Sequence, residues 1–322
     1  MTVKPPPRNI CVLGGTGFVG RALAAHLVRA GYRVTIPTRR RQRNRDLLVL
    51  PGVELIGADV HDERALAALL GGADAVINLV GILNERGRDG SGFKHVHVDL
   101  VAKLLRACHE TGVTRLLHMS ALKANADRGP SHYLRTKGQA EQLIRNEARD
   151  VRFTIFKPSV IFGPGDSFTN RFATLLKRLP ILPLPSADSR MTPAYVNDVA
   201  AAFMAALDDS RTFGQTYELC GPDIYSLEEV VRLVRRQLGL RRVIVPLPKS
   251  LGRLQAWVGE FLPGKPISLD NLASLSVAGV CSENGFAALG IEPQALSVIA
   301  PTYLAPRRPT ARPPAGFSAQ AL

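Results

Sequence analysis

Tyr133 and Lys137 have the side-chain types and the spacing needed for acid–base chemistry. They are four residues apart on a helix predicted near 134–148, so their side chains share one helix face. A free tyrosine has a pKa of about 10, and a neighbouring ammonium favours its phenolate and brings that pKa towards the working range. Ser120, after a predicted strand, offers a hydroxyl that can donate a hydrogen bond to a substrate carbonyl. We take these three residues as the candidate catalytic set, with Ser120 as an ordinary loop serine the alternative.

A glycine-rich segment near the amino end predicts a site for a dinucleotide. Ile10–Leu13 reads as a strand, and residues 21–30 read as a helix. Between them lies GGTGFVG, whose members include Gly14, Thr16, Gly17, Phe18, Val19 and Gly20. Glycines permit a tight turn and the close approach of a pyrophosphate, which then lies on the free N–H groups of the helix. The alternative is a glycine-rich turn with no ligand.

Arginines at the end of the second predicted strand favour NADP(H) over NAD(H). An NAD enzyme usually carries an acidic residue there, whereas this chain has Thr38-Arg39-Arg40, followed by Arg41, Arg43 and Arg45. Guanidinium groups pair well with the 2′-phosphate of NADP(H). NAD(H) remains the alternative cofactor. The segment can also be a solvated basic loop, or one that contacts a membrane or nucleic acid.

The first half of the chain alternates β-branched runs with helical patterns, which predicts an α/β fold with a doubly wound parallel sheet of the Rossmann type. Predicted strands are Ile10–Leu13, Arg33–Thr38, Val53–Gly57, Ala75–Leu79, Leu116–Met119 and Phe153–Phe156. Predicted helices lie near 18–30, 63–70, 95–111 and 134–148. We expect a nucleotide-binding domain over 1–160, with returning elements from 193–222.

The rest of the chain predicts a smaller mixed α/β substrate or partner region over 161–305 and a disordered tail over 306–322. We expect helices near 168–178, 197–208 and 249–262, strands at Thr216–Leu219 and near 243–245, and a helix capped by Ser226. In the helix near 249–262, five large apolar residues share one face and Trp257 lies beside them. That face predicts peripheral contact with a membrane or a membrane-bound partner. The alternative is burial of the face against the protein's own core.

Composition limits the classes of function. The 322 residues are 46% hydrophobic and 21% charged, as in an ordinary globular protein. The net charge of +14 favours anionic partners, among which a dinucleotide is preferred and nucleic acid is not expected. Residues 65–83 are apolar but are interrupted by glycines and polar residues, so we expect no transmembrane helix. The beginning, MTVKPPPRN, lacks the apolar run of a signal peptide.

Cysteines and histidines give no metal signal. Cys11, Cys108, Cys220 and Cys281 are widely spaced, and we interpret them as reduced core thiols in a cytosolic-type compartment. His95 and His97 are expected on different sides of a helix, and we interpret them, with His109, His118 and His132, as structural or surface residues.

With these motifs in hand, the chain resembles the extended and atypical short-chain dehydrogenase/reductase superfamily over residues 9–300. More narrowly, it resembles the branch that contains the nucleotide-binding accessory subunit of respiratory complex I and its bacterial relatives. The landmarks are GGTGFVG at 14–20, ADV at 58–60, NLVG at 78–81, HMS at 118–120, YLRTK at 133–137, KPSVIFGPG at 157–165 and PAYVNDV at 193–199.

The resemblance assigns further positions around a bound cofactor. It implies that Asp59 and Val60 flank the adenine, and that Val80 and Gly81 lie beside the ribose and nicotinamide. It also implies that Pro158 and Val160 meet the nicotinamide end, and that Ser120, Tyr133 and Lys137 match the superfamily's Ser–Tyr–Lys set. Lys137 can instead bind the nicotinamide ribose hydroxyls without any turnover.

Three hypotheses for the function follow. The first is an NADP(H)-binding protein linked to quinone-dependent respiratory metabolism, as an accessory subunit of complex I or an auxiliary factor in ubiquinone biosynthesis. The second is a free-standing NADP-dependent reductase, dehydratase or epimerase of a small carbonyl, sugar or isoprenoid substrate. The third is a nucleotide-sensing regulator. We expect a cytoplasmic location, with attachment to the inner face of the cytoplasmic membrane as its peripheral variant.

Overall fold

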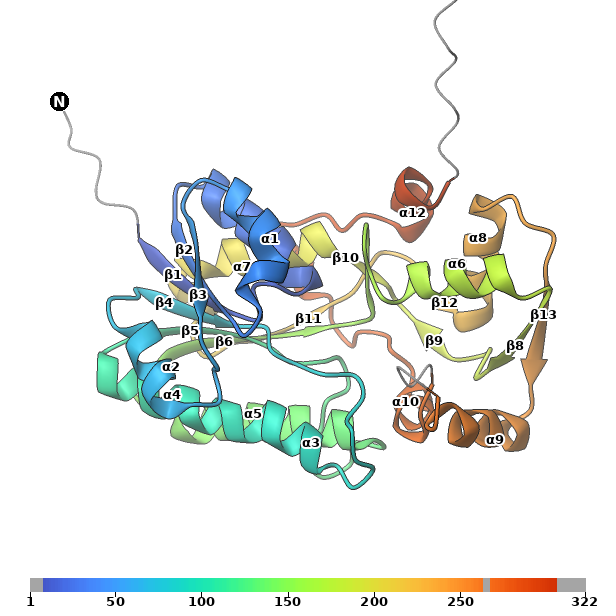
Figure 1. Ribbon diagram of the computed structural model, residues 1–322, viewed down its shortest axis with the longest axis horizontal. Coiled ribbons are helices and arrows are strands. Elements are labelled where there is room, and N and C mark those ends of the chain that lie inside the picture. The colour runs from blue at the N-terminus through green and yellow to red at the C-terminus, as the bar shows by residue number, and fades with distance from the viewer. Residues whose placement is uncertain (1–7, 263–266, 306–322) are drawn as a thin grey trace, which may run out of the picture.

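A seven-stranded parallel sheet forms the centre of the protein (Figure 1). The computed structural model describes residues 8–262 and 267–305, so the tail expected over 306–322 lies outside the described residues. The strand order is β11-β6-β5-β4-β1-β2-β3, and every neighbouring pair is parallel. The strands are β1 (Asn9–Leu13), β2 (Arg33–Thr38), β3 (Val53–Gly57), β4 (Ala75–Asn78), β5 (Arg115–Met119), β6 (Arg152–Pro158) and β11 (Thr216–Leu219). This arrangement confirms the predicted fold class.

Helices cover both faces of the sheet, because its central strands are apolar on both sides. α1 (Phe18–Arg29) and α7 (Val196–Leu207) pack on one face, with a core that includes Ile10, Leu23 and Phe203. The opposite face is covered by α2 (Glu63–Leu70), α4 (Leu100–Thr111) and α5 (His132–Glu147). Crossovers run outward in both directions from the β1–β4 pair. The carboxyl ends of these two strands therefore flank the topological switch point, where α/β proteins bind their ligands.

The helix predicted near 95–111 begins earlier and is not regular. Its first part is α3 (Ser91–Lys94), and its last part is α4. Between them, the single π-helical turn η2 (His95–Asp99) widens the helix and leaves His97 buried. Periodicity cannot reveal such a turn, because one extra residue per turn shifts every later side chain around the helix axis.

The remaining elements form a second cluster beyond the carboxyl edge of the sheet (Figure 1). Its helices are α6 (Thr169–Arg178), α8 (Leu227–Gln237), α9 (Lys249–Gly259), α10 (Leu269–Leu275) and α12 (Leu296–Leu304). Its strands are β7 (Ile161–Phe162), β8 (Ile181–Pro185), β9 (Arg190–Met191), β10 (Ala194–Tyr195), β12 (Tyr225–Ser226) and β13 (Val243–Leu247). The short helix α11 (Gly285–Ala288) instead packs beside β11, and its Phe286 belongs to the core of the central sheet. Two 3₁₀ segments, η1 (Arg41–Val49) and η3 (Ser210–Thr212), complete the fold. The predicted Ser226 cap is confirmed, since its side chain and that of Glu229 form a capping box.

The apolar face of α9 points to solvent, so the alternative of burial against the core is wrong. Leu254 is 55% exposed, and Phe261, just beyond the helix, is 62% exposed. The buried residues of α9 are Gly252, Ala256 and Gly259. In the described part of the chain, no helix is long and apolar enough to cross a membrane.

Two of the four cysteines are bonded to each other, which corrects our interpretation of all four as reduced thiols. Cys220 and Cys281 form a disulfide across 61 residues of sequence. Folding brings the end of β11 against residues 281–284, where the side-chain amide of Asn284 donates to the Cys220 carbonyl at 2.9 Å. Cys11 and Cys108 are free and buried as expected, and burial raises the pKa of each thiol to about 12.

Removal of this disulfide should destabilise the oxidised protein. Closing a loop of 61 residues restricts the unfolded chain, and losing such a crosslink typically costs about 2–4 kcal/mol. The double variant Cys220→Ser/Cys281→Ser should therefore unfold at lower denaturant than the wild type without reductant, and at the same concentration as the wild type with reductant. Equal midpoints in both conditions would show that the bond does not form in solution.

Candidate functional site

The glycine loop lies against the beginning of the segment that follows β4. Gly14 has a φ of +79°, and a Cβ added to it would meet the Leu79 carbonyl carbon at 3.0 Å and the Val80 nitrogen at 3.1 Å. A Cβ added to Gly20 would meet the Gly14 carbonyl oxygen at 2.5 Å. Backbone occupies the space that side chains would need at both positions. Because both positions are glycine, the loop can pass between β1 and β4, and the start of α1 can pack directly against the loop.

The amino end of α1 provides the donors for an anion. The helix begins at Phe18, so the N–H groups of its first residues, including Val19, have no carbonyl within the helix to bind. The loop that leads to them is held by a hydrogen bond from the Gly17 N–H to the Gly14 carbonyl at 2.9 Å. Together with the partial positive charge of the helix end, these donors suit a pyrophosphate. The Phe18 ring extends towards Gly163 in the KPSVIFGPG segment.

The arginine segment after β2 is anchored to the glycine loop by Arg21, which we did not single out from the sequence. The Arg21 guanidinium donates to the Thr16 carbonyl at 3.0 Å, to the Asn44 side chain at 2.9 Å and to the Asp46 carboxylate. The neighbouring Arg39 and Arg40 side chains are exposed at the carboxyl end of β2. Arg21 thus fixes this segment beside the nucleotide loop while Arg39 and Arg40 stay accessible. In the sequence, this contact is indicated by the position of Arg21 directly after the last glycine of the motif.

Asp59 and Val60 follow β3 at the same edge of the sheet. Asp59 is exposed, and its carboxylate accepts the His61 N–H at 3.1 Å, which stabilises the turn into α2. The His61 ring stacks on His95 with 4.2 Å between ring centres. Asp59 and Val60, which we expect to flank the adenine, are therefore next to a stacked pair of histidines that we did not identify from the sequence.

Lys137 lies between the ends of β4 and β5. Its side chain is buried, and its ammonium donates to the Met119 carbonyl at 3.0 Å and to the Val80 carbonyl at 3.4 Å. A Cβ on Gly81 would lie 3.2 Å from the Lys137 nitrogen, so the glycine leaves room for the buried ammonium at the edge of the sheet. Burial lowers the pKa of Lys137 to about 8, and Glu141 opposes this effect. The structure thus brings Val80, Gly81 and Lys137 together at the edge of the sheet.

Tyr133 lies one helical turn before Lys137, but its phenol is not activated as we expected. Its ring packs edge-on against His97 and Phe93, with ring centres 5.6 and 6.2 Å away. Burial raises the pKa of Tyr133 to about 12, and the carboxylate of Asp270 adds to the rise. The expected lowering by Lys137 is wrong for this arrangement, because the ammonium is directed to strand-end carbonyls. Tyr133 therefore keeps its proton at neutral pH.

The Ser120 hydroxyl is directed into the protein and not towards a substrate. Ser120 is buried and donates to the carboxylate of Glu141, which also accepts from Lys157 at 3.1 Å and from Arg145 at 3.2 Å. In this structure the hydroxyl proton is therefore unavailable to a carbonyl, contrary to our expectation. Glu141 lies four residues after Lys137, so its position on the helix was the signal that we missed.

His97 lies beside the candidate site and has a structural role there, in agreement with our interpretation. Its Nε2 accepts the Ile82 N–H at 3.3 Å, and its Nδ1 lies 2.9 Å from the Thr136 hydroxyl. Because that hydroxyl donates to helix carbonyls, His97 carries its proton on Nδ1. Burial lowers the pKa of His97 to about 2, and the Lys137 charge adds to the effect. A neutral His97 thus joins α5 to the loop after Gly81.

Pro158 and Val160 lie where β6 ends, beside the loop that follows Ser120. The Pro158 carbonyl accepts the Leu122 N–H at 2.9 Å, and the Val160 carbonyl accepts the Ala194 N–H at 2.9 Å. Pro158 is buried, and Val160 is partly exposed. They complete the edge of the sheet at which the candidate residues from β1, β2, β3, β4 and β5 also gather. Among the described residues, no group of three or more His, Cys, Asp or Glu side chains forms a metal site.

Comparison with known proteins agrees with this geometry. A model of the NAD dependent epimerase/dehydratase family matches residues 10–220. The chain is 31% identical over 289 residues to "NADH dehydrogenase [ubiquinone] 1 alpha subcomplex subunit 9, mitochondrial" of Arabidopsis thaliana, covering 85% of this chain and 71% of that protein. It is 30% identical over 252 residues to "Ceramide reductase" of Caulobacter vibrioides, covering 74% and 73%.

Solved structures share the fold at lower identity. UDP-glucose 4-epimerase of Thermotoga maritima superposes with a TM-score of 0.71 at 16% identity, covering 92% of this chain and 97% of the other. UDP-glucose 4-epimerase of Thermus thermophilus, in complex with NAD, superposes with a TM-score of 0.65 at 20% identity, covering 82% and 98%.

The pKa of Lys137 gives a prediction for nucleotide binding. Its ammonium is present below pH 8 and is lost as the pH rises through about 8, which removes one hydrogen-bond donor from the site. The dissociation constant for NADPH should therefore rise between pH 7 and pH 9.5 in the wild type. In Lys137→Met, binding should be weaker and independent of pH across that range, whereas the exposed-site control Lys177→Met should behave as the wild type. The same pH slope in Lys137→Met would exclude this role.

Proposed function

The chain belongs to the NAD dependent epimerase/dehydratase family, and we propose that it binds NADP(H) and serves quinone-linked respiratory metabolism. Its role there would be that of an accessory subunit of complex I or of an auxiliary factor in ubiquinone biosynthesis. The observation that carries the nucleotide part is the arginine segment after β2, held beside the glycine loop by Arg21.

The preference for NADP(H) over NAD(H) follows from charge. Arg39 and Arg40 are exposed where the adenine ribose of a nucleotide on α1 would lie, and no acidic residue is present between Thr38 and Arg45. The first carboxylate after β2 is Asp46, and it is paired with Arg21. A 2′-phosphate would therefore meet guanidinium groups and no competing anion.

At the other end of the nucleotide, Lys137 is placed to bind the nicotinamide ribose. Two of its three donors are directed to the Met119 and Val80 carbonyls, which leaves the third for a ribose hydroxyl. Pro158 and Val160 would line the nicotinamide end, and Asp59 and Val60 the adenine end. This role of Lys137 requires no reaction.

The link to quinones rests on the relatives. "NADH dehydrogenase [ubiquinone] 1 alpha subcomplex subunit 9" occurs among them in Arabidopsis thaliana and, at 29% identity over 305 residues, in Mus musculus. We propose a corresponding partner for this chain and a location at the inner face of the cytoplasmic membrane. Purification of the native protein, followed by mass spectrometry of bound nucleotide and associated proteins, tests this. Recovery of NADP(H) with respiratory or quinone-biosynthesis proteins supports the proposal, and recovery of a protein free of both contradicts it.

A second candidate function is a free-standing NADPH-dependent reductase of a lipid carbonyl. Two observations favour it: Tyr133 lies one helical turn before Lys137 on α5, and a relative is named ceramide reductase. In such a reaction a hydride from NADPH would add to the carbonyl carbon, and the Tyr133 hydroxyl would give its proton to the developing alkoxide. A phenol with a raised pKa remains a stronger acid than an alcohol, so this transfer is favourable.

Loss of either arginine should weaken the binding of NADPH. A charge-assisted hydrogen bond is worth about 1.5–3 kcal/mol, so Arg39→Ala or Arg40→Ala should weaken NADPH on the order of 10–100-fold. NADH should bind with nearly unchanged affinity. Arg33→Ala, at the opposite end of β2, is the matched control and should change neither. Equal affinity of the wild type for NADPH and NADH in titration calorimetry would contradict the assignment.

Tyr133→Phe separates catalysis from binding. If Tyr133 donates a proton, the variant should bind NADPH normally and lose about 10²–10⁴-fold in turnover with carbonyl or quinone substrates. Lys137→Ala should weaken NADPH binding in either case. The control Tyr32→Phe removes a hydroxyl that contacts Asp208, away from the site. An intact rate in Tyr133→Phe would eliminate the catalytic role, and the absence of any rate in the wild type would favour the binding-only function.

A further inference from the structure

α9 packs on the protein through its smallest side chains. Its buried residues, Gly252, Ala256 and Gly259, are spaced four and three residues apart and form one stripe along the helix. Cβ atoms built on the two glycines would meet Pro185 of β8 at 2.9 Å and the Ile267 carbonyl oxygen at 2.7 Å. The glycine side of the helix is therefore held against the protein by close contacts with the Pro185 side chain and the Ile267 backbone, so the helix cannot rotate its large side chains inward.

The large apolar side chains lie on the opposite side and face solvent. We call this set the α9 outer face: Leu251 50%, Leu254 55%, Trp257 50%, Val258 47%, Phe261 62% and Leu262 50% exposed. The two-stranded sheet beside α9 adds Ile181, 56% exposed, and its partner Val243, 57% exposed. An exposed apolar surface such as the α9 outer face marks an interaction site in a folded protein.

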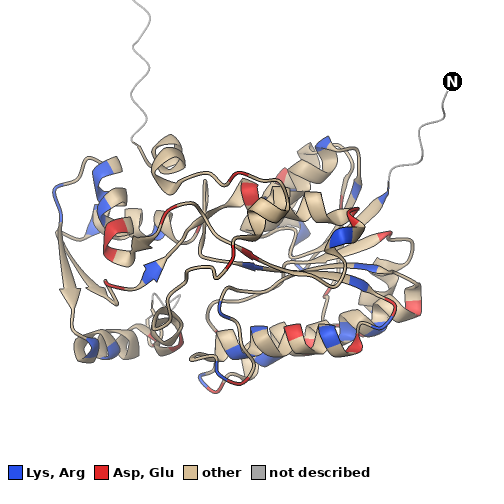
Figure 2. Ribbon diagram, turned by 180° about the vertical axis from the view of Figure 1, so that it is seen from behind, with Lys and Arg blue, Asp and Glu red and all other residues tan. Residues whose placement is uncertain are grey.

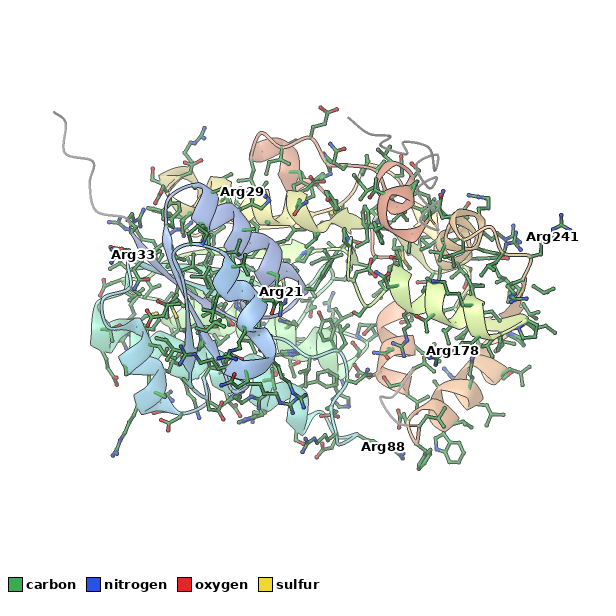
Figure 3. The ribbon with its side chains drawn as sticks, turned by 45° about the horizontal axis from the view of Figure 1, so that its top comes forward. Arg21, Arg29, Arg33, Arg88, Arg178 and Arg241 are labelled. Atoms are coloured by element: carbon green, nitrogen blue, oxygen red, sulfur yellow. A yellow bond between two sulfur atoms is a disulfide. The ribbon has the colours of Figure 1, made fainter. Side chains whose placement is uncertain are left out.

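Positive charge borders this surface. Lys249 and Arg253 are exposed on the same helix, and α9 carries no acidic residue in the ribbon of Figure 2. The nearest acidic residue in the sequence, Glu260, is turned inward with a side chain 8% exposed, and it is paired with Arg88 at 2.9 Å. Figure 3 shows Arg88, Arg178 and Arg241 at this end of the molecule, with Arg29 and Arg33 at the other.

We propose that the α9 outer face docks on an anionic lipid bilayer. A helix lying in a membrane interface presents leucines and phenylalanines to the acyl chains, with tryptophan and basic residues at the headgroups. Leu254 and Phe261 would contact the acyl chains. Trp257, Lys249 and Arg253 would lie at the headgroups. The basic residues beside the α9 outer face complement the charge of anionic headgroups, whereas an apolar groove of a partner protein would not require them. This docking is independent of the proposed reaction, since none of these residues belongs to the nucleotide site.

Docking in this orientation would also bring a cavity with a mixed polar and apolar lining to the membrane surface. The cavity has a volume of about 480 Å³ and is lined by Trp257 and Leu269 on one side, and by Ser131 and His132 at the start of α5 on the other. His132 is the neighbour of Tyr133 in the sequence.

The chain contains a single tryptophan, so Trp257 fluorescence reports directly on this surface. We expect the full chain to float with phosphatidylcholine vesicles that contain phosphatidylglycerol, and the Trp257 emission to shift to the blue and to be quenched by brominated acyl chains. Lys249→Gln and Arg253→Gln should each lower the partition coefficient about fivefold at low salt. Arg29→Gln and Arg33→Gln, with the same loss of charge at the other end, should lower it less.

The double variant Leu254→Glu/Phe261→Glu should abolish flotation while NADPH affinity and far-ultraviolet circular dichroism stay unchanged. Val298→Glu is the matched control, because Val298 is 62% exposed on α12, as Phe261 is beside α9. Three results would overturn the proposal: no flotation of the wild type with anionic vesicles at low salt, flotation that survives the double variant, or a dimer in light scattering that the double variant dissociates. The last would mean that a second copy covers the face.

Discussion

Close contact between two backbone segments, the glycine loop after β1 and residues 79–80 after β4, determines the geometry of the whole site. Gly14 and Gly20 leave no room for a Cβ, so α1 begins directly at the carboxyl edge of the sheet. The N–H groups of that helix then face the same space as the ends of β2, β4 and β5. A side chain at either glycine would push α1 away from the sheet and separate the anion site from Arg39, Val80 and Lys137.

A second constraint is the burial of basic groups at the ends of β4 and β5. Lys137, His97 and His118 are all buried there, and the Lys137 charge contributes to lowering the pKa of both histidines. The imidazoles are therefore neutral and act as hydrogen-bonding scaffolds, while the Lys137 ammonium supplies positive charge at the ends of β4 and β5. Glu141 lies deeper, and it binds Ser120, Lys157 and Arg145. Its charge favours the protonated form of Lys137 without occupying the ammonium's donors.

Local sequence patterns predicted the strands of the sheet and the glycine loop closely, since each depends on residues that are neighbours in the chain. β2, β3 and β11 have the predicted limits, and β1, β4 and β5 differ by one residue. Features that join distant segments could not be predicted. The Cys220–Cys281 bond, the contact of Ser120 with Glu141 and the influence of Asp270 on Tyr133 all depend on tertiary packing. The outward orientation of α9 is a related case, because helical periodicity identifies an apolar face and not the direction in which it points.

A structure of the NADPH complex tests the central claim most directly. We expect the pyrophosphate on the N–H groups at the start of α1, the 2′-phosphate within hydrogen-bond distance of Arg39 or Arg40, and a nicotinamide ribose hydroxyl on the Lys137 nitrogen. NADPH bound with its 2′-phosphate directed away from both arginines, or bound away from the glycine loop, would contradict it.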